Sequence, residues 1–395
     1  MSRKSDRWTN LHDARAAARA ALPRMVFDFV DGGAGDEVSA RANLSAYADV
    51  RFAPRVLVDV SALRLETTVL GTPLSIPVVL GPTGMPALVH PSAERGAAAA
   101  AFEHGTAFTM STTSSFSAAE VVKHTEGPLW FQLYAWKDRA LTEEVIAQAR
   151  EAGARALLFT VDTPTAGIRE RDLRNGMTVP PRVNMRNAVD VLSHLGWGWR
   201  FRQGPGIRLG TISGLGAVPK TGALGVAGWF GHLFNRSQTW DDLEWIQDQW
   251  RGPIAVKGIM TPADARRAHE LGAAAVVVSN HGGRQLDGVQ ATIEALPRVV
   301  DELVGTSTEV LIDGGVRRGA DVVKALALGA RAVLIGRPWL YGLAADGRHG
   351  VSAVLRMLTH EIQNTLELLG CADVNDLDRR FLAHPCRPGT GRNPG

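Results

Sequence analysis

The sequence is poor in cysteine and has no strong net charge. Its 395 residues include two cysteines, Cys371 and Cys386, and carry a formal net charge of +3. Two cysteines near the C-terminus form neither a disulfide framework nor a metal-ligand cluster, so we expect no metal site and a reducing compartment. So small a charge does not indicate nucleic-acid binding.

Membrane-spanning and secretory segments are also missing. No run approaches the roughly 18 consecutive apolar residues that a spanning helix requires. The N-terminal stretch MSRKSDRWTNLHDARAAARAAL is charged and lacks the apolar centre of a secretory signal. We therefore expect a cytoplasmic protein, formed by one domain over 1–395, that is still able to touch a membrane surface.

Three sequence motifs of large enzyme classes are absent. Without G-x-S-x-G, the HGG at 281–283 is a poor candidate for the oxyanion loop of an α/β-hydrolase. Without GK[ST] there is no phosphate loop of the NTPase kind, and no G-x-G-x-x-G follows a predicted strand. These absences disfavour hydrolases of that fold, NTPases and nicotinamide-dependent dehydrogenases.

Short apolar runs alternate with helical patterns along most of the chain. We predict strands at 77–82, 106–110, 129–133, 155–161, 253–257, 274–279, 309–313 and 331–335. We predict helices at 92–104, 117–124, 139–152, 261–271, 290–304 and 318–329. Buried strands separated by helices indicate a parallel sheet, and eight such units fit a (β/α)8 TIM barrel. Periodicity alone leaves a doubly wound sheet open.

Each predicted strand ends in polar or glycine residues. They are Pro82, Thr83 and Gly84; Ser111; Gln132 and Tyr134; Thr160 and Asp162; Lys257; Ser279 and His281; Asp313, Gly314 and Gly315; and Gly336 with Arg337. A barrel builds its active site at the carboxyl ends of its strands. Eight polar endings therefore favour the barrel.

The last two strand ends resemble a phosphate site. DGGVRRG (313–319) and IGRP (335–338) fall where barrels bind phosphate with backbone N–H groups and a helix N-terminus. Arg317 and Arg337 would add charge-assisted contacts. The alternative is a pair of ordinary turns.

A long insertion after the fourth strand, at 172–236, and a helical N-terminal extension within 1–70 lie outside the repeating pattern. From 182 to 236 there are seven basic residues and one acidic residue, a net +6. With Trp197, Trp199, Trp229 and Phe230, this composition suits either an interfacial membrane contact or a lid packed on the barrel. Residues 385–395 are expected to form a flexible tail.

Several motifs together resemble the FMN-dependent α-hydroxy-acid oxidases and dehydrogenases, a family that includes glycolate oxidase, lactate dehydrogenase and mandelate dehydrogenase. The resemblance covers about residues 20 to 380. Its motifs are LPRMVFDFVDGGAGDE, GPTGM, WFQLY, TVDTPTAGIRERDLRNG, VKG, SNHGGRQLDG, DGGVRRG and IGRP. GGAGDE, GPTGM, LWFQLY and GIRERDLRN are most similar to mandelate-type members.

The resemblance implies FMN across the barrel mouth. By this resemblance, the flavin ring would be faced by Pro82, Thr83 and Gly84, and its edge would be hydrogen-bonded by Ser111, Gln132 and Thr160. Lys257 would lie near N1 of the ring, and Ser279 would contact another ring atom. Asp313 would bind the ribityl chain, and the phosphate side would be formed by Gly314, Gly315, Arg317, Gly336 and Arg337. A fixed ammonium stabilises the negative charge of reduced flavin near N1. Lysine is rarely buried without a partner, and the alternative for Lys257 is an extended side chain that reaches solvent.

The resemblance also assigns the chemistry. His281 would be the base that takes a proton as the substrate is oxidised, with Asp162 orienting it. Arg169 and Arg284 would hold the substrate carboxylate, and Tyr134 would hydrogen-bond the substrate. The alternative for each arginine is a surface ion pair with Glu170, Asp172 or Asp287. Hydride transfer and carbanion formation both remain open.

Three positions depart from glycolate oxidases. Phe29 replaces a tyrosine that contacts the substrate carboxylate, and Thr113 replaces a large tryptophan. Both changes predict an aromatic or bulky L-2-hydroxy acid. Gly84 stands where many oxidases of the family have alanine. This difference favours a dehydrogenase, which passes electrons to a quinone, over an oxidase, which passes them to oxygen.

Two other functions remain open at this stage. A phosphate-binding TIM-barrel isomerase or lyase would share DGG and GRP but would not need His281 with Arg284. A flavin-binding barrel without catalysis is the second. The resemblance further implies a homotetramer, a small-molecule substrate, an electron acceptor that is a quinone or oxygen, and no nucleic acid.

Overall fold

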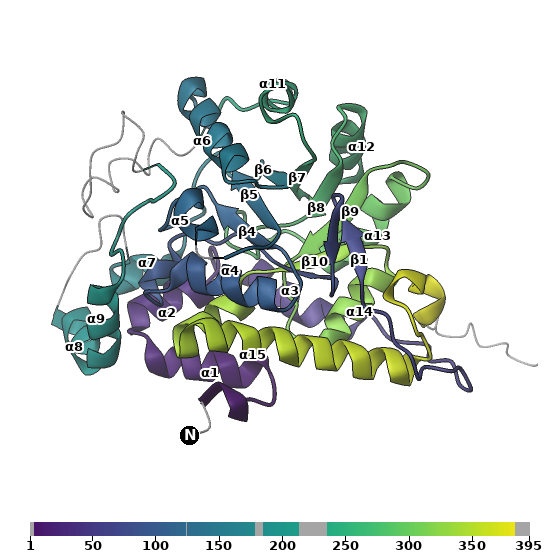
Figure 1. Cartoon of the computed structure of the whole chain (residues 1–395), viewed down its shortest axis with the longest axis horizontal. Coiled ribbons are helices and arrows are strands. Elements are labelled where there is room, and N and C mark those ends of the chain that lie inside the picture. Colours follow the sequence, from purple (N-terminus) through teal and green to yellow (C-terminus); the bar gives the residue numbers. More distant parts are fainter. Residues whose placement is uncertain (1–3, 124, 178–184, 213–234, 384–395) are drawn as a thin grey trace, which may run out of the picture.

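The protein is a closed barrel of eight parallel strands surrounded by helices (Figure 1). The computed structural model describes residues 4–123, 125–177, 185–212 and 235–383. Around the barrel the strands follow the order β10-β3-β4-β5-β6-β7-β8-β9, so the last strand closes on the first. The predicted (β/α)8 TIM barrel is confirmed, and the doubly wound alternative is wrong.

The barrel strands occur where the apolar runs predicted them. They are β3 (Val78–Leu80), β4 (Phe108–Ser111), β5 (Leu129–Leu133), β6 (Ala156–Thr160), β7 (Ile254–Ile259), β8 (Ala275–Val278), β9 (Glu309–Asp313) and β10 (Ala332–Ile335). Every boundary lies within two residues of its prediction. The agreement is close because each strand is buried throughout or nearly so.

The six predicted helices are also present within two residues at each end. They are α4 (Ala93–Glu103), α5 (Ala118–Val122), α6 (Arg139–Glu151), α12 (Pro262–Glu270), α13 (Thr292–Glu302) and α14 (Gly319–Ala327). The predicted helical N-terminal extension contains α1 (Leu11–Ala21), α2 (Arg24–Asp31) and α3 (Val38–Ser45). The structure adds α7 (Glu170–Asn175), α8 (Met185–Ser193), α9 (Leu195–Gln203), α11 (Asp241–Trp250) and α15 (Arg337–Leu369). Short 3-10 turns include η3 (Pro86–Leu88).

Side-chain alternation along the strands divides the barrel interior into an apolar and a polar layer. Inward-facing residues recur every second position, so Trp130 in the lower layer is followed by Gln132 above it. The same step leads from Ala255 to Lys257 and from Leu311 to Asp313. Trp130, Ala255 and Leu311 belong to one buried apolar cluster inside the barrel. The polar ends of the strands therefore converge at the carboxyl mouth.

A hairpin closes the opposite end of the barrel. β1 (Thr67–Val69) pairs antiparallel with β2 (Thr72–Leu74). Val69 and Leu74 join the apolar cluster inside the barrel. The indole N–H of fully buried Trp130 donates to the Thr72 hydroxyl at 3.1 Å. This plug leaves the carboxyl mouth as the end that opens toward the candidate site.

The N-terminal extension packs along the C-terminal helix α15 (Figure 1). The sequence did not predict α15 because Gly and Pro interrupt its helical pattern. Backbone angles inside it are non-helical at Asp346 (φ −148°) and Gly347 (φ 57°), where two helices join at a kink. The extension thus lies against the segment that follows the eighth strand.

The described part of the insertion lies beside the barrel mouth. The Trp197 indole N–H donates to the Leu88 carbonyl of η3 at 2.8 Å, and its ring stacks on Phe201 at 5.1 Å. Near the end of this part, the Arg208 guanidinium pairs with Glu120 at 2.6 Å. Trp229 and Phe230 lie outside the described residues, as does the predicted tail at 385–395.

The described helices include none that is long and apolar enough to cross a membrane.

Asp31 joins four helices through one carboxylate. Arg15 of α1 binds both of its oxygens at 2.6 and 2.8 Å, and Tyr341 of α15 donates to Oδ1 at 2.7 Å. Arg171 of α7 donates to Oδ2 at 3.1 Å. Burial by itself raises the pKa of Asp31, but Arg15 and Tyr341 outweigh burial and lower the pKa to about 2.

We predict that Asp31→Asn lowers the free energy of unfolding by about 1–2 kcal/mol at pH 7. A lowered native pKa gives stability that is complete above pH ~4 and is lost as pH falls toward 2, so the deficit of the variant should shrink over that window. Urea unfolding at pH 7, 4 and 3 measures it. Asp36→Asn, at an exposed residue of the same loop, is the control; equal losses for both variants would contradict the prediction.

Candidate active site

A pocket of about 1080 Å³, its open mouth included, lies at the carboxyl ends of the barrel strands. Strand ends and the following loops supply most of its wall. Of the predicted site residues, the wall contains Phe29, Pro82, Thr83, Gly84, Ser111, Gln132, Tyr134, Thr160, Lys257, His281, Arg284, Asp313, Gly314, Gly315, Arg317, Gly336 and Arg337. Residues from all parts of the chain thus meet in one cavity.

His281 and Asp162 form a pair at the pocket edge. Nδ1 of His281 lies 3.0 Å from Oδ1 of Asp162. Burial raises the pKa of Asp162, but the neighbouring His281 and Lys257 leave it below its ordinary value. Asp162 is therefore an anion at neutral pH, and it fixes the imidazole with Nδ1 as donor and Nε2 free to accept. The second carboxylate oxygen of Asp162 is buried and has no partner among the described residues.

Lys257 is buried in the polar layer and has two partners. Its ammonium donates to the Ser279 hydroxyl and pairs with Asp313, both at 2.8 Å. Burial lowers the pKa of Lys257, yet Asp313 and Asp162 outweigh burial and raise it. The charge is held in place by the strand ends, so the solvent-reaching alternative is wrong for this lysine, which is 4% exposed.

Phe29 lies close to both predicted substrate arginines. The guanidinium carbons of Arg284 and Arg169 lie 5.4 and 5.9 Å from its ring centroid. Burial and the charges of Arg169 and Arg337 lower the pKa of Arg284 to about 9, which leaves it cationic at neutral pH. Arg169 also pairs with Asp172 at 2.8 Å, as its alternative interpretation allowed. The phenyl ring thus contacts both cations and offers neither a polar group.

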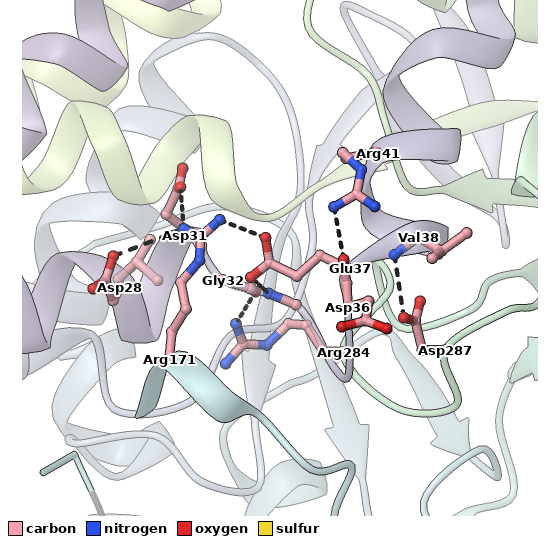
Figure 2. A network of polar contacts seen from close by, with 12 residues as sticks. Asp28, Asp31, Gly32, Asp36, Glu37, Val38, Arg41, Arg171, Arg284 and Asp287 are labelled. Atoms are coloured by element: carbon pink, nitrogen blue, oxygen red, sulfur yellow. Dashed lines mark hydrogen bonds and ion pairs between the residues drawn. The ribbon is translucent and has the colours of Figure 1, made fainter. Parts of the chain in front are cut away.

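A network of ion pairs and hydrogen bonds next to Arg284 fixes the loop after α2 in the N-terminal extension (Figure 2). Arg284 donates to the Gly32 carbonyl at 2.9 Å. Arg171 pairs with Glu37, whose other oxygen accepts from the Gly33 N–H at 2.9 Å. Figure 2 shows these groups arranged around the loop after α2. Arg284 is therefore oriented by backbone that belongs to the extension.

Side chains at the ends of the neighbouring strands β4, β5 and β6 are linked by hydrogen bonds. The Ser111 hydroxyl donates to Oε1 of Gln132 at 3.0 Å, and Nε2 of Gln132 donates to Thr160 at 3.1 Å. Thr113 extends the chain, since its hydroxyl lies 3.0 Å from that of Ser111. Thr113 lies behind Gly84 rather than on the pocket wall. The effect of Thr113 on the size of the substrate stays a prediction.

Glycines line the side of the pocket predicted to hold phosphate. Gly314 and Gly315 have φ of 92° and 84°, a region that favours glycine. A Cβ at Gly315 would lie 1.8 Å from the Asn43 carbonyl oxygen. The Arg337 guanidinium donates to the carbonyls of Val30, Gly282 and Gly32 at 2.7–3.2 Å. These contacts use three of its five N–H groups, so two remain for a ligand.

The pocket also contains residues that the sequence did not single out. They are mainly apolar and include Val30, Met85, Val89, Leu334, Ile335 and Leu340. Apolar side chains beside strand ends are the commonest pattern in a barrel, so no local signal marks them. Three predicted site residues do not line the pocket but contact residues that do. Asp162 contacts His281, Arg169 contacts Phe29, and Ser279 contacts Lys257.

One family matches the sequence over nearly its full length. The family is described as FMN-dependent dehydrogenase, and the match covers residues 18–384. The chain belongs to the FMN-dependent dehydrogenase family. Its enzymes use FMN, and the phosphate-binding isomerase therefore loses its support.

Relatives and solved structures agree with this membership. The chain is 44% identical to an L-lactate dehydrogenase from Caulobacter sp. over 94% of its length and 97% of the relative's. It is 43% identical to an L-lactate oxidase from Nostoc sp., with 94% and 97% covered. A crystal structure of the monotopic membrane protein (S)-mandelate dehydrogenase matches with a TM-score of 0.91 at 37% identity, covering 96% of this chain and all of that one.

The pocket of this family member has unsatisfied groups that suit FMN. Buried Thr83 Oγ1 and Asp313 Oδ1 have no partner among the described residues. An FMN ring edge and ribityl hydroxyls offer donors and acceptors to such atoms. Glycine backbone at 314, 315 and 336 leaves room for a phosphate. The residues present fit FMN.

We predict that Gly84→Ala acts through Thr113. A Cβ at Gly84 would lie 2.5 Å from Thr113 Oγ1, so Thr113 must leave its bond with Ser111. We expect a loss of about 1–3 kcal/mol in the free energy of unfolding. Most of the loss should disappear when the same change is made together with Thr113→Ala, as urea unfolding of the four proteins would measure.

Gly196→Ala is the matched control, because no atom lies within 4 Å of a Cβ built there. It should leave stability unchanged or slightly higher. An equal cost of Gly84→Ala with and without Thr113→Ala would contradict the coupling.

Proposed function

We propose that the enzyme oxidises an L-2-hydroxy acid to the 2-oxo acid, with FMN as its cofactor. The observation that carries this proposal is the His281–Asp162 pair, 3.0 Å apart, beside the cationic Arg284 in the same pocket. A base and a carboxylate-binding cation are what such a substrate requires. A flavin-binding barrel without catalysis would need neither.

The substrate carboxylate would bind at the arginines. Arg284 is partly buried, and its own N–H groups have the Gly32 carbonyl as a described partner. Its lowered pKa reflects burial and repulsion from Arg169 and Arg337, so an anion placed there relieves an excess of positive charge. Tyr134, on the same wall, would donate its hydroxyl to the substrate.

His281 would hold and move the proton. With Nδ1 donating to Asp162, Nε2 is the atom that accepts the proton from the substrate. Asp162 stays ionised and stabilises the resulting imidazolium. FMN, when bound, supplies the acceptor for the two electrons. Lys257 places a permanent positive charge at the base of the pocket.

Phe29 supports an aromatic or bulky substrate. It offers the substrate an apolar ring instead of a hydroxyl, and Val30, Met85 and Leu340 add apolar wall. The relatives named above act on lactate or mandelate, which are both 2-hydroxy acids. We infer a substrate of this class, with mandelate-like acids preferred to glycolate.

The electron acceptor and the assembly belong to the proposal as well. Gly84 supports a dehydrogenase that transfers electrons to a quinone and reacts slowly with oxygen. The homotetramer stays a prediction, which a mass from light scattering would test. An apolar run at Val56, Leu57 and Val58 is 82, 103 and 43% exposed and would suit burial against another copy.

We predict that wild-type protein binds FMN and that L-lactate or (S)-mandelate bleaches it without oxygen. His281→Gln should keep its flavin absorbance, yet the bleaching rate should fall about 10²–10⁴-fold because the base is lost. Anaerobic stopped flow measures both rates. Mixing the reduced enzyme with air-saturated buffer then tests the acceptor, since fast reoxidation would reject a dehydrogenase.

His269→Gln is the control, because His269 lies on α12 and contacts Thr308 outside the pocket. It should bleach at the wild-type rate. The proposed function fails if no 2-hydroxy acid bleaches the wild type, or if His281→Gln bleaches within tenfold of it.

The insertion supports a peripheral membrane contact. Met185, Val189 and Leu192 of α8 are 83, 63 and 66% exposed. Their spacing of four and three residues places them on one face. Leu195 and Trp199 of α9 add side chains that are 72 and 66% exposed. Trp197 instead packs toward the barrel, so the insertion combines a docked side with an apolar outer side.

We predict that the enzyme pellets with anionic phospholipid vesicles and that Leu192→Glu with Leu195→Glu reduces the bound fraction at least tenfold. Each leucine removed from an apolar surface costs roughly 1–2 kcal/mol of binding. Val304→Glu with Leu368→Glu is the matched control, since these residues are 73 and 71% exposed on other helices and loops. Equal pelleting of both double variants, or no pelleting of the wild type, would reject the contact.

A further inference from the structure

The turn that carries His281 has an unusual backbone. His281, Gly282 and Gly283 have φ of 58°, 64° and 72°, so three successive residues are left-handed. Glycine adopts this conformation freely, but for histidine it costs about 1–2 kcal/mol. Surrounding contacts must hold such a strained residue in place. The direction of the imidazole therefore depends on what fixes the turn.

The Asn280 side chain closes this turn from within. Its Oδ1 accepts from the Gly283 N–H at 3.1 Å, across His281 and Gly282. Its Nδ2 donates to the Gln290 carbonyl at 3.2 Å. Asn280 is 6% exposed, so its amide is nearly shielded from water. The Gly283 N–H also donates to the Asn280 backbone carbonyl at 3.0 Å, so rotation of the amide would remove one of the two bonds that span the turn.

The amide of Asn280 is itself held by Asn43 of α3. Asn43 Nδ2 donates to Asn280 Oδ1 at 2.8 Å, and Asn280 Nδ2 donates to Asn43 Oδ1 at 3.0 Å. The Thr292 N–H also donates to Asn43 Oδ1 at 3.1 Å. The Thr292 N–H thus requires the oxygen of Asn43 at its position, and the two reciprocal bonds then set the orientation of the Asn280 amide. Both amides have only one orientation that satisfies them.

The backbone of the extension lies directly against the turn. The Ala34 N–H donates to the Gly283 carbonyl at 2.8 Å. A Cβ at Gly283 would lie 2.5 Å from the Ala40 nitrogen of α3. No water fits into so close a contact, and the turn has no room to relax toward α3. Asn43 is 2% exposed at the centre of this interface.

We propose that Asn43 is a positioning residue for His281 and acts through Asn280. The N-terminal extension is then part of the catalytic apparatus, because it holds the left-handed turn that aims the imidazole at Asp162. Asn43 does not line the pocket itself, although it packs behind Gly314 and Gly315 of its wall, and its described side-chain hydrogen bonds go to Asn280 and Thr292. The inference rests on the proposed role of His281 as the base.

The test uses FMN-loaded Asn43→Ala, Asn280→Ala and the double variant. We expect Asn43→Ala to lower kcat per bound flavin about 10–100-fold while KM changes less than threefold, because misplacing a catalytic group slows the reaction more than it weakens binding. In the Asn280→Ala background, Asn43→Ala should lower kcat less than threefold further. A role through Asn280 predicts this non-additivity.

Imidazole NMR supplies a readout that does not depend on activity. His281 resonances, assigned by their loss in His281→Gln, should shift in Asn43→Ala because the bond to Asp162 is disturbed. Ser39→Ala is the matched control, since Ser39 lies on the same helix and the hydroxyl that this change removes exchanges its described hydrogen bonds with Val289, beyond the turn. It should leave the His281 resonances and kcat within twofold of wild type.

Three outcomes would overturn the proposal. One is an unchanged kcat per bound flavin in Asn43→Ala, including the case in which the variant only loses stability or flavin. The second is additive losses in the double variant. The third is an equal effect of Ser39→Ala. If His281→Gln is as active as wild type, the proposed function itself fails, and that result is distinct from a failure at Asn43.

Discussion

The closed barrel imposes the constraint on which the site depends. Eight parallel strands that close on themselves must direct every second side chain inward. The lower inward layer is filled by apolar residues such as Trp130, and the hairpin after Val69 plugs that end. Only the upper layer is left to hold polar groups. Lys257 and Asp313 can share that layer because they neutralise each other at 2.8 Å.

The charged groups of the pocket differ in whether the protein itself supplies a partner of opposite charge. Lys257 and Asp162 are both held in their charged forms by their neighbours. Arg284 lies among cations and lacks a matching carboxylate within the pocket wall described here. The other charges of the site are therefore balanced by the protein, and the position beside Arg284 still favours an anion. A carboxylate substrate would balance that position.

The extension and the insertion both adapt the mouth of the barrel, and they meet where the Arg24 N–H of α2 donates to Asp190 of α8 at 2.6 Å. The extension supports Arg284 through the Gly32 carbonyl and the His281 turn through Asn43. The insertion packs on η3, whose Pro86 lines the pocket, through the bond from Trp197 to Leu88. Neither segment belongs to the repeating βα units. Both nevertheless determine how the strand ends are presented to a ligand.

Much of the fold was open to prediction because its signals are local. Buried strands such as 129–133 and 309–313 are apolar runs of the right length, and their predicted bounds agree with β5 and β9. The long helix α15 was missed because Asp346 and Gly347 break its pattern at a kink. Trp197 was grouped with exposed tryptophans, since composition cannot show that its indole would reach a carbonyl of η3.

The sequence by itself determined the order of strands and helices, the polar strand ends and the motif around His281. The tertiary structure alone decided which distant groups meet. Asn43 and Asn280 are 237 positions apart, and no local pattern pairs them. Arg337 follows a strand end that predicted a phosphate contact, yet its guanidinium turns to carbonyls at Val30 and Gly32. Hydrogen bonds of this kind depend on how separate segments pack, which periodicity along one segment does not encode.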